Sequence, residues 1–315
     1  MTVVESSILP KGIYSPIPTY YKNDGKFSLD TETQVKHALM LYESGINGLV
    51  VSGSMGESTN ISPAERNSAL RNLRQAIPDK TFKLIAGMPP NSVAEVITES
   101  EESKKNGADF IILLVPGYFG PNLISQQGII DYFLNVADYT ALPIVIYNYP
   151  GVCNNVNIMI ETFETLSKHE NIAAVKLTHF NLDIYTLLGN NKTYETNNFR
   201  PFTGLGQVLI PSLSVGMFGA IDGLSGIFPK SMLKLMKLYE DGEKEKALQL
   251  QYIVTKVDLM ISELNVVGVK QLLKEVYGYG EIVSGRPPLS KPVDLNAYKK
   301  YETDIKILAE IEKSL

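Results

Sequence analysis

Two apolar segments, PIVIY at residues 143–147 and IAAVKL at residues 172–177, decide the fold. Each is a nearly continuous apolar run, which is typical of a strand buried on both faces of a parallel sheet. Enough residues separate the two runs for a crossover helix, and a parallel return strand requires such a connection. The two segments therefore predict a β-α-β unit.

Similar runs recur along the chain, and the starts of successive runs lie 20 to 36 residues apart. This spacing leaves room for a helix after every strand. Repeated strand–helix units predict an α/β protein with a (β/α)8 TIM barrel over residues 1–228, and an open doubly wound sheet is the alternative. The eight runs occupy residues 12–18, 48–51, 83–86, 110–115, 143–147, 172–177, 199–203 and 219–224.

Signals for helix ends lie between these runs. Ser62 with Glu65, and Ser92 with Glu95, have the spacing of a capping box, in which each side chain satisfies a free backbone N–H group. Gly45 stands where a left-handed residue would end the first helix. The sequence therefore predicts helix starts directly after Ser62 and after Ser92.

Residues 229–315 continue the chain beyond the eighth run with mainly helical patterns. Since no low-complexity linker precedes them, we expect a C-terminal helical region packed on the barrel rather than a separate domain. Its first helix carries an apolar stripe at residues 232, 235, 236 and 239. Later helices are expected at 243 to about 264, continuing over 265–277, and at 295–315 after a turn-rich connector at 278–292.

The composition is that of a globular protein, with 44% hydrophobic and 20% charged residues among 315. A net charge of −5 gives nucleic acids and anionic membranes no reason to bind. The apolar runs are too short to span a bilayer, and residues 1–11 have neither a signal-peptide nor a transit-peptide pattern. The single cysteine, Cys153, excludes an intramolecular disulfide and suits a reducing compartment, so we expect a cytoplasmic location.

Lys176 ends the sixth run, and reactive side chains of such barrels lie at the carboxyl ends of strands. Its apolar neighbours favour an ammonium group that points into the barrel mouth. Burial disfavours the charged form, so Lys176 is a candidate amine nucleophile for a carbonyl carbon. The alternative is a strand-end lysine that reaches solvent or pairs with a carboxylate.

Tyr147 ends the neighbouring run within reach of Lys176, and its phenol is a candidate proton carrier for imine chemistry. The alternative is a tyrosine at the edge of the core. After the second run, the loop Gly53-Ser54-Met55-Gly56-Glu57 combines turn-forming glycines with backbone N–H groups that suit an anion, most simply a carboxylate. A plain tight turn is the alternative. No Gly-Lys-Ser/Thr sequence follows, so a nucleotide loop is not expected.

The histidines and the single cysteine are weaker candidates for catalytic groups. The three histidines, His37, His169 and His179, are scattered and lack the spacing of metal ligands. No Gly-x-Ser-x-Gly elbow exists, and Cys153 lies in a loop where a nucleophilic role is not favoured. We therefore expect an amine mechanism with neither metal nor organic cofactor.

Three motifs, taken in order, resemble the dihydrodipicolinate synthase/N-acetylneuraminate lyase family of class I aldolases. They are the loop at 53–57, the Tyr-Asn-x-Pro sequence at 147–150, and Lys176, which lies 29 residues after Tyr147. Segments 12–20 and 116–118 also fit. The resemblance extends through the barrel and much of the C-terminal region, and it implies a pyruvate-dependent lyase.

By this resemblance, Lys176 forms a Schiff base with the keto carbon of pyruvate or another 2-oxo acid, and Tyr147 shuttles protons. Ser54 would link Tyr147 to Tyr118, which a neighbouring subunit usually supplies in the family, so we expect a homo-oligomer, either a dimer or a tetramer. The carboxylate would rest on the backbone of Ser54 and Met55 and on the Ser54 hydroxyl. The remaining residues assigned to the substrate site are Gly53, Gly56, Gly204, Gly206 and Ile221.

Two departures from the family pattern narrow the expected activity. Val152 stands where dihydrodipicolinate synthases typically carry an arginine, so the guanidinium expected to hold aspartate semialdehyde is missing. Met55 replaces a residue that usually carries a hydroxyl. Residues 147–152 and 175–178 look most like the fungal-type 2-keto-3-deoxy sugar acid aldolases, such as the L-threo-3-deoxy-hexulosonate aldolases.

We therefore expect reversible cleavage of a 2-keto-3-deoxy sugar acid to pyruvate and an aldehyde. Two alternatives stay open at this point. One is a condensing synthase of lysine biosynthesis, which the missing arginine disfavours. The other is a non-catalytic barrel that binds a small molecule, which the joint presence of lysine, tyrosine and glycine loop disfavours.

Overall fold

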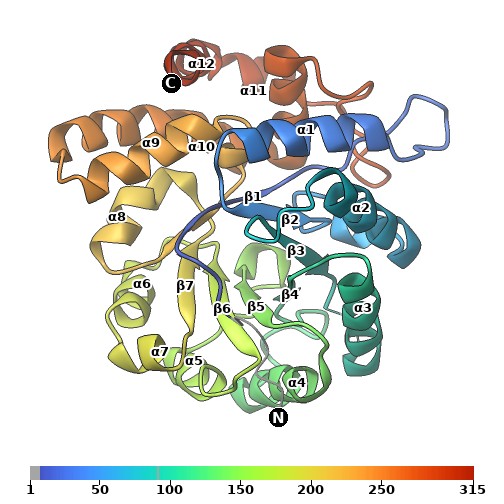
Figure 1. Ribbon diagram of the computed structural model, residues 1–315, viewed down its shortest axis with the longest axis vertical. Coiled ribbons are helices and arrows are strands. Elements are labelled where there is room, and N and C mark those ends of the chain that lie inside the picture. Colours follow the sequence, from blue (N-terminus) through green and yellow to red (C-terminus); the bar gives the residue numbers. More distant parts are fainter. Residues whose placement is uncertain (1–7, 91) are drawn as a thin grey trace.

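The computed structural model describes residues 8–90 and 92–315, so part of the segment 1–11 lies outside the described residues. Within them, eight parallel strands close into a barrel in the order β1 to β8 (Figure 1). Helices follow the strands around the outside, which confirms the predicted (β/α)8 barrel with further C-terminal helices. The open-sheet alternative is wrong because β1 pairs with β8.

The strands are short and almost wholly buried, and all but β8 begin and end within two residues of the predicted runs. β8 ends at Ile221, earlier than predicted, because the Asp222 carboxylate accepts the Ser225 N–H group at 3.0 Å and starts a turn. The bounds are β1 Gly12–Pro16, β2 Gly48–Val51, β3 Lys83–Met88, β4 Phe110–Leu114, β5 Ile144–Asn148, β6 Ile172–Leu177, β7 Arg200–Thr203 and β8 Gly219–Ile221.

The barrel helices begin where the sequence predicts. Ser62 and Ser92 form complete capping boxes with Glu65 and Glu95. Gly45 has φ +89°, the left-handed conformation expected after the first helix. The bounds are α1 Thr31–Glu43, α2 Pro63–Ala76, α3 Val93–Lys105, α4 Gln126–Tyr139, α5 Ile160–Leu166, α6 Leu182–Gly189, α7 Lys192–Thr196 and α8 Leu209–Ser214, with 3₁₀ turns η1 Ser58–Asn60, η2 Pro150–Val152, η3 Gly206–Val208 and η4 Leu224–Gly226.

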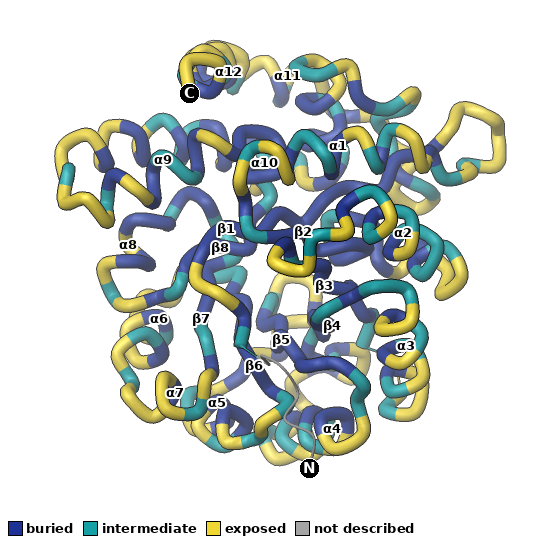
Figure 2. Tube along the Cα trace, viewed as in Figure 1, coloured by how far each residue is buried: buried dark blue, intermediate teal, exposed yellow. Residues whose placement is uncertain are grey.

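Apolar side chains fill both faces of the barrel wall. One cluster lies inside the barrel, and a larger one lies between the strands and the surrounding helices. Figure 2 shows the strands as a mostly buried layer within partly exposed helices. Burial on both faces explains why the strands read as continuous apolar runs rather than alternating ones. The inner cluster includes Tyr14, Val50, Ile85, Ile112, Val145, Tyr147, Phe202 and Ile221.

The first two C-terminal helices pack on the turns that follow β7 and β8, since α10 contacts η3 and α9 contacts η4. The last two, α11 and α12, pack on α9 and α10 instead (Figure 1). Asn265, at the junction of the two predicted helical patterns, has non-helical dihedral angles inside α10 (φ 51°, ψ −143°). The bounds are α9 Pro229–Glu240, α10 Lys244–Tyr277, α11 Leu295–Lys299 and α12 Glu302–Ser314.

The single helix predicted at 295–315 is wrong, because the chain turns between α11 and α12. Lys300 Nζ and the Tyr301 hydroxyl both reach Glu263 of α10, at 3.0 and 2.6 Å. These contacts tie the turn to the long helix. They cannot be read from the local pattern.

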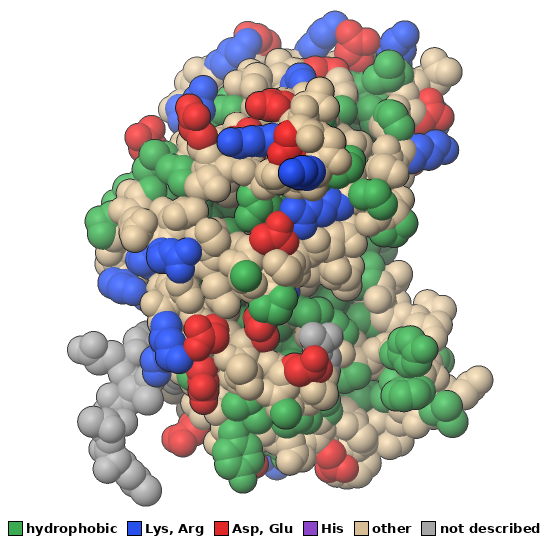
Figure 3. Space-filling view, turned by 90° about the vertical axis from the view of Figure 1, so that its right-hand side faces the viewer, with side chains coloured by type: hydrophobic (Ala, Val, Ile, Leu, Met, Phe, Trp, Pro, Cys, Tyr) green, Lys and Arg blue, Asp and Glu red, His purple; other side chains and the backbone are tan. Residues whose placement is uncertain are grey.

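On the face drawn in Figure 3, acidic and basic side chains are mixed, and no extended basic patch is visible there. In residues 8–90 and 92–315, no helix is long and apolar enough to cross a membrane.

Candidate active site

β5 and β6 place the two main candidates side by side. Tyr147 pairs with Lys176 in the parallel register of the two strands. The Lys176 Nζ atom lies 4.3 Å from the centre of the Tyr147 ring. Lys176 is 5% exposed and Tyr147 is 6% exposed. The solvent-facing alternative for Lys176 is therefore wrong, and the structure brings amine and phenol together inside the barrel mouth.

Burial lowers the pKa of Lys176 from its usual value of 10.5 to about 7, because the ammonium loses its hydration. The buried Asp222 carboxylate opposes this effect and raises the pKa. Desolvation is the larger of the two causes, since β6 is buried along its whole length. A large fraction of the amine is therefore neutral near pH 7 and can attack a carbonyl carbon.

Burial raises the pKa of Tyr147 to about 12, while hydrogen bonds with Thr178 and Ser54 act in the opposite direction. The Thr178 hydroxyl donates to the phenol oxygen at 3.4 Å. The phenol is therefore protonated at neutral pH. In the resting site it can donate a proton, and it can accept one only after it has done so.

The loop after β2 brings the Ser54 side chain to this tyrosine. The Glu57 N–H group donates to the Ser54 carbonyl at 3.2 Å, and the Ser58 N–H group donates to the Gly53 carbonyl at 3.1 Å. The Glu57 side chain is fully buried, and its Oε1 atom lies 2.5 Å from Lys270 Nζ in α10. A buried ion pair thus fixes the loop to the C-terminal region, a contact that the sequence analysis did not predict.

Lys176, Tyr147 and Ser54 border a cavity of about 90 Å³ at the carboxyl end of the barrel. That is several times the space that one ordered water molecule needs. Five predicted site residues line it together, namely Lys176, Tyr147, Ser54, Met55 and Gly204. The other lining residues are Pro16, Tyr149, Thr178, Leu205, Gly223, Asp258, Ile261, Ser262 and Asn265.

Gly204 is a glycine because neighbouring side chains occupy the space of a Cβ atom. A Cβ there would lie 2.0 Å from Thr178 Oγ1 and 2.9 Å from Lys176 Cε. Any larger residue would displace the hydroxyl or the lysine side chain. This close approach supports the prediction that Gly204 belongs to the site.

The remaining predicted site residues lie outside the cavity lining. Gly53 and Gly56 shape the loop, Gly206 begins the η3 turn, and Ile221 is buried among the apolar residues inside the barrel. Tyr118 is 91% exposed on the loop that follows β4. In the single chain, Tyr118 therefore does not take part in the cavity that Ser54 lines.

Several residues of the site escaped sequence reasoning. Asp222 directly follows an apolar strand, and this position was a usable signal. Asp258, Ser262 and Asn265 belong to a long helix far along the chain, and only tertiary packing brings them to the cavity. No local pattern marks them as functional.

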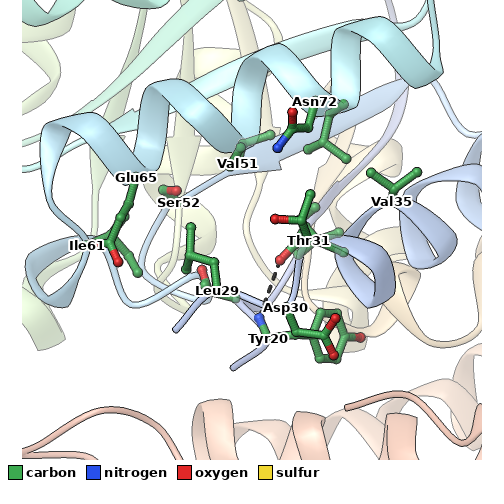
Figure 4. Close-up of a pocket in the computed structure, with 15 residues that line it drawn as sticks. Tyr20, Leu29, Asp30, Thr31, Val35, Val51, Ser52, Ile61, Glu65 and Asn72 are labelled. Atoms are coloured by element: carbon green, nitrogen blue, oxygen red, sulfur yellow. Dashed lines mark hydrogen bonds between the residues drawn. The ribbon is translucent and has the colours of Figure 1, made fainter. Parts of the chain in front are cut away.

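A second, smaller cavity lies between α1, α2 and the segment before α1 (Figure 4). Its volume of about 20 Å³ suits about one water molecule. The two acids that line it already have structural partners: Asp30 accepts the Thr33 N–H group at 3.1 Å, and Glu65 pairs with Arg286 at 2.5 Å. This cavity therefore shows no candidate chemistry.

No cluster of three or more His, Cys, Asp and Glu side chains that could hold a metal ion occurs in the part of the chain that the structure describes. His37 Nε2 donates to the Gly226 carbonyl at 2.7 Å, and burial lowers the pKa of this histidine to about 4. Burial also raises the pKa of the Cys153 thiol to about 11. Both side chains are therefore structural rather than reactive.

The whole barrel and all residues that line the cavity lie within the part of the chain that matches a known protein family. Residues 9–308 match the model of the Dihydrodipicolinate synthetase family. The chain belongs to this family. Members are pyruvate-dependent aldolases that form a Schiff base, so the protein is a carbon–carbon lyase that uses pyruvate with an aldehyde.

Two fungal relatives are similar over most of their length. A protein of Emericella nidulans named "Probable 4-hydroxy-2-oxoglutarate aldolase, mitochondrial" is 31% identical, with 87% of each chain covered. The "L-threo-3-deoxy-hexylosonate aldolase" of Aspergillus niger is 26% identical, with 98% of this chain and 97% of the relative covered. These similarities match the predicted resemblance to fungal-type aldolases.

A solved 4-hydroxy-tetrahydrodipicolinate synthase from Methylacidiphilum fumariolicum has the same fold, with a TM-score of 0.86. It is 28% identical, and the alignment covers 97% of this chain and 99% of the synthase. The family therefore contains both lyases and synthases on one scaffold, and the substrate has to be argued from the site.

Proposed function

We propose that the enzyme reversibly cleaves a 2-keto-3-deoxy sugar acid to pyruvate and an uncharged hydroxyaldehyde. The observation that carries this proposal is the pairing of Lys176, a buried amine whose pKa is near neutral, with the Tyr147 phenol on the adjacent strand. The L-threo-3-deoxy-hexylosonate aldolase relative supports the substrate class.

The first step is attack of the neutral Lys176 amine on C2 of the keto acid. The resulting carbinolamine loses its hydroxyl group as water when the Tyr147 phenol donates a proton to it. The products are a cationic imine and a tyrosinate. The neighbouring Thr178 and Ser54 hydroxyls stabilise the tyrosinate, since hydrogen bonds with them lower the pKa of the phenol.

The second step breaks the C3–C4 bond. The tyrosinate accepts the proton of the C4 hydroxyl, the aldehyde forms at C4, and the electron pair of the broken bond flows into the cationic imine. The re-formed Tyr147 phenol gives its proton to C3 of the enamine. Water then hydrolyses the cationic imine, which releases pyruvate, returns a proton to the tyrosinate and frees the neutral Lys176 amine. The imine is the electron sink, so these residues suffice without a further group.

The loop after β2 is proposed to bind the carboxylate of the keto acid. Ser54 and Met55 line the cavity, and the loop is rigidly turned by its own backbone hydrogen bonds. Backbone N–H groups in such a turn suit an anion. Gly53 and Gly56 would shape this turn.

We further propose that the enzyme is a homo-oligomer in which Tyr118 of one subunit approaches Ser54 of another. Support comes from the loop after β4, where Tyr118, Phe119 and Leu123 are 91%, 67% and 77% exposed. Apolar side chains this exposed are typical of protein–protein contacts. Sedimentation would distinguish monomer, dimer and tetramer.

A cytoplasmic location is proposed from composition alone. The name of the Emericella nidulans relative includes "mitochondrial". Fractionation of the producing cells would decide between the two locations.

The rival function is condensation of pyruvate with aspartate semialdehyde. Val152, 47% exposed in η2, offers no guanidinium for the carboxylate of that substrate. Loss of such a charge-assisted contact costs about 2–4 kcal/mol, or roughly 30- to 1000-fold in kcat/KM. The test is to condense pyruvate with glyceraldehyde, lactaldehyde and aspartate semialdehyde and to rank kcat/KM. If aspartate semialdehyde is preferred by more than about tenfold, the enzyme is a synthase.

A further inference from the structure

One side of α10 forms a wall of the catalytic cavity. Asp258, Ile261, Ser262 and Asn265 line it opposite the barrel residues. Their spacing of three, four and seven residues places them on one face of the helix. Three of the four carry polar groups, and none of them has a role in the chemistry of Lys176 and Tyr147.

Contacts with the η3 turn fix this wall in place. The Gln207 N–H group donates to Asp258 Oδ2 at 3.0 Å, and the Thr255 hydroxyl donates to the Gln207 carbonyl at 3.0 Å. The Gln251 amide donates to the Gly206 carbonyl at 3.1 Å. Since η3 directly follows β7, the helix is held at a defined position against the strand that borders Lys176.

Asp258 is the deepest polar group of the wall, with 4% exposure. A second buried acid, Asp222, approaches it from the end of β8. A Cβ atom at Gly206 would lie 3.1 Å from Asp222 Oδ1 and 3.5 Å from Asp258 Oδ2, so both carboxyl groups border the same small space. Burial raises the pKa of Asp222 to about 6, and burial together with the charge of Asp222 raises the pKa of Asp258 to about 7.

Ser262 and Asn265 lie at the exposed rim of the same wall. Asn265 has φ 51° and ψ −143°, a conformation that is strained for any residue with a side chain. Its Oδ1 atom accepts the Val266 N–H group at 2.9 Å. Strain of this kind concentrates at ligand sites, and here the strained residue borders the catalytic cavity.

The charges of the lining limit which aldehydes fit. Lys176 is the only cation among the described residues that line the cavity. Once Lys176 is a cationic imine, its charge is balanced by the carboxylate of the keto acid. A second carboxylate, on the aldehyde half, would have no cationic partner in the cavity, and above about pH 7 it would also face the ionised Asp258.

From this arrangement we infer that the cavity face of α10 is the aldehyde-binding wall: Asp258 binds a hydroxyl group of the aldehyde half, and Ser262 and Asn265 bind hydroxyl groups farther out. The same wall selects uncharged hydroxyaldehydes over aldehydes that carry a carboxylate. This inference rests on the proposed function and specifies which part of the site recognises the aldehyde half of the substrate.

The test compares glyceraldehyde with glyoxylate, a small aldehyde that carries a carboxylate, as partners of pyruvate at about pH 8, where Asp258 is mostly ionised. Asp258→Asn keeps the side-chain shape and an acceptor for the Gln207 N–H group but removes the charge. We expect kcat/KM for glyceraldehyde to fall about ten- to a hundredfold and kcat/KM for glyoxylate to rise. The preference of the enzyme for glyceraldehyde over glyoxylate should therefore decrease. Trapping of pyruvate by borohydride should stay unchanged.

Glu263→Gln is the matched control, because it removes a charge from the same helix at a residue that contacts Lys300 and Tyr301 instead of the cavity. Asn265→Gly is a second variant, in which glycine suits the positive φ but the acceptor of the Val266 N–H group is lost, so its thermal unfolding is measured alongside. It should raise KM for glyceraldehyde several-fold with little change in pyruvate trapping.

The outcomes separate the two claims. A wild-type enzyme that prefers aspartate semialdehyde contradicts the proposed function. An Asp258→Asn enzyme that traps pyruvate normally but keeps the parental ratio of glyceraldehyde to glyoxylate overturns the role of α10. Unchanged KM for glyceraldehyde in Asn265→Gly overturns it as well.

Discussion

The pH dependence of imine formation follows directly from the burial of Lys176. With a pKa lowered from 10.5 to about 7, about half of the amine is neutral at pH 7, against about 0.03% for an ordinary lysine. The enzyme thus has roughly a thousandfold more nucleophile at neutral pH than a solvated lysine would give. The nucleophile is present above the lowered pKa and is lost as the pH falls through it.

We therefore expect the rate of pyruvate trapping, measured at low pyruvate with a borohydride quench from pH 5 to 9, to rise about tenfold per unit at first. It should reach half its limit near pH 7 and then level off. A midpoint near pH 9 or 10 would show that Lys176 is solvated and would refute the reasoning.

The Asp222→Asn variant tests in which direction the pH midpoint of pyruvate trapping moves. The Asp222 carboxylate raises the pKa of Lys176, so Asp222→Asn should move the midpoint to lower pH. An asparagine retains an acceptor for the Ser225 N–H group, which keeps the turn after β8. Glu263→Gln, which lies away from the cavity, should leave the midpoint unchanged. A midpoint that rises in Asp222→Asn would contradict the electrostatic account.

Two further predictions concern the phenol and the glycine loop. Tyr147→Phe keeps the ring but removes the proton carrier, so kcat should fall about 10²–10⁴-fold while pyruvate binding changes little; a loss below about threefold would assign the proton transfer to another group. Lys270→Met removes the ammonium partner of the buried Glu57 carboxylate, which keeps only the Arg286 N–H group as a strong donor, and should lower the free energy of unfolding by about 3–5 kcal/mol. Urea unfolding with a lower midpoint and an unchanged m-value would show this loss of stability. Adding Glu57→Gln to Lys270→Met should restore part of the lost free energy of unfolding.

The fold was predictable because each local signal agreed with the barrel. Continuous apolar runs require burial on both faces, and the capping boxes at Ser62 and Ser92 fixed two helix starts. The failures arose where distant contacts decide the local structure. The turn between α11 and α12 depends on Glu263, and the early end of β8 depends on the Asp222 side chain.

The site was predictable only for residues at strand ends and in the loop after β2. Lys176 and Tyr147 are neighbours because parallel register puts the ends of β5 and β6 together. Asp258 could not be found in the same way, since its position follows from how α10 packs on η3. Tyr118 lies outside the cavity of the single chain, so its predicted role depends on a second subunit.

The central claim is that Lys176 is the amine that forms the Schiff base. Incubation with pyruvate and borohydride, followed by mass spectrometry of the peptides, tests it most directly. We predict one reduced pyruvyl group per chain, on Lys176, and no activity in the modified enzyme. Modification of another lysine, or an active enzyme that is never modified, would contradict the account.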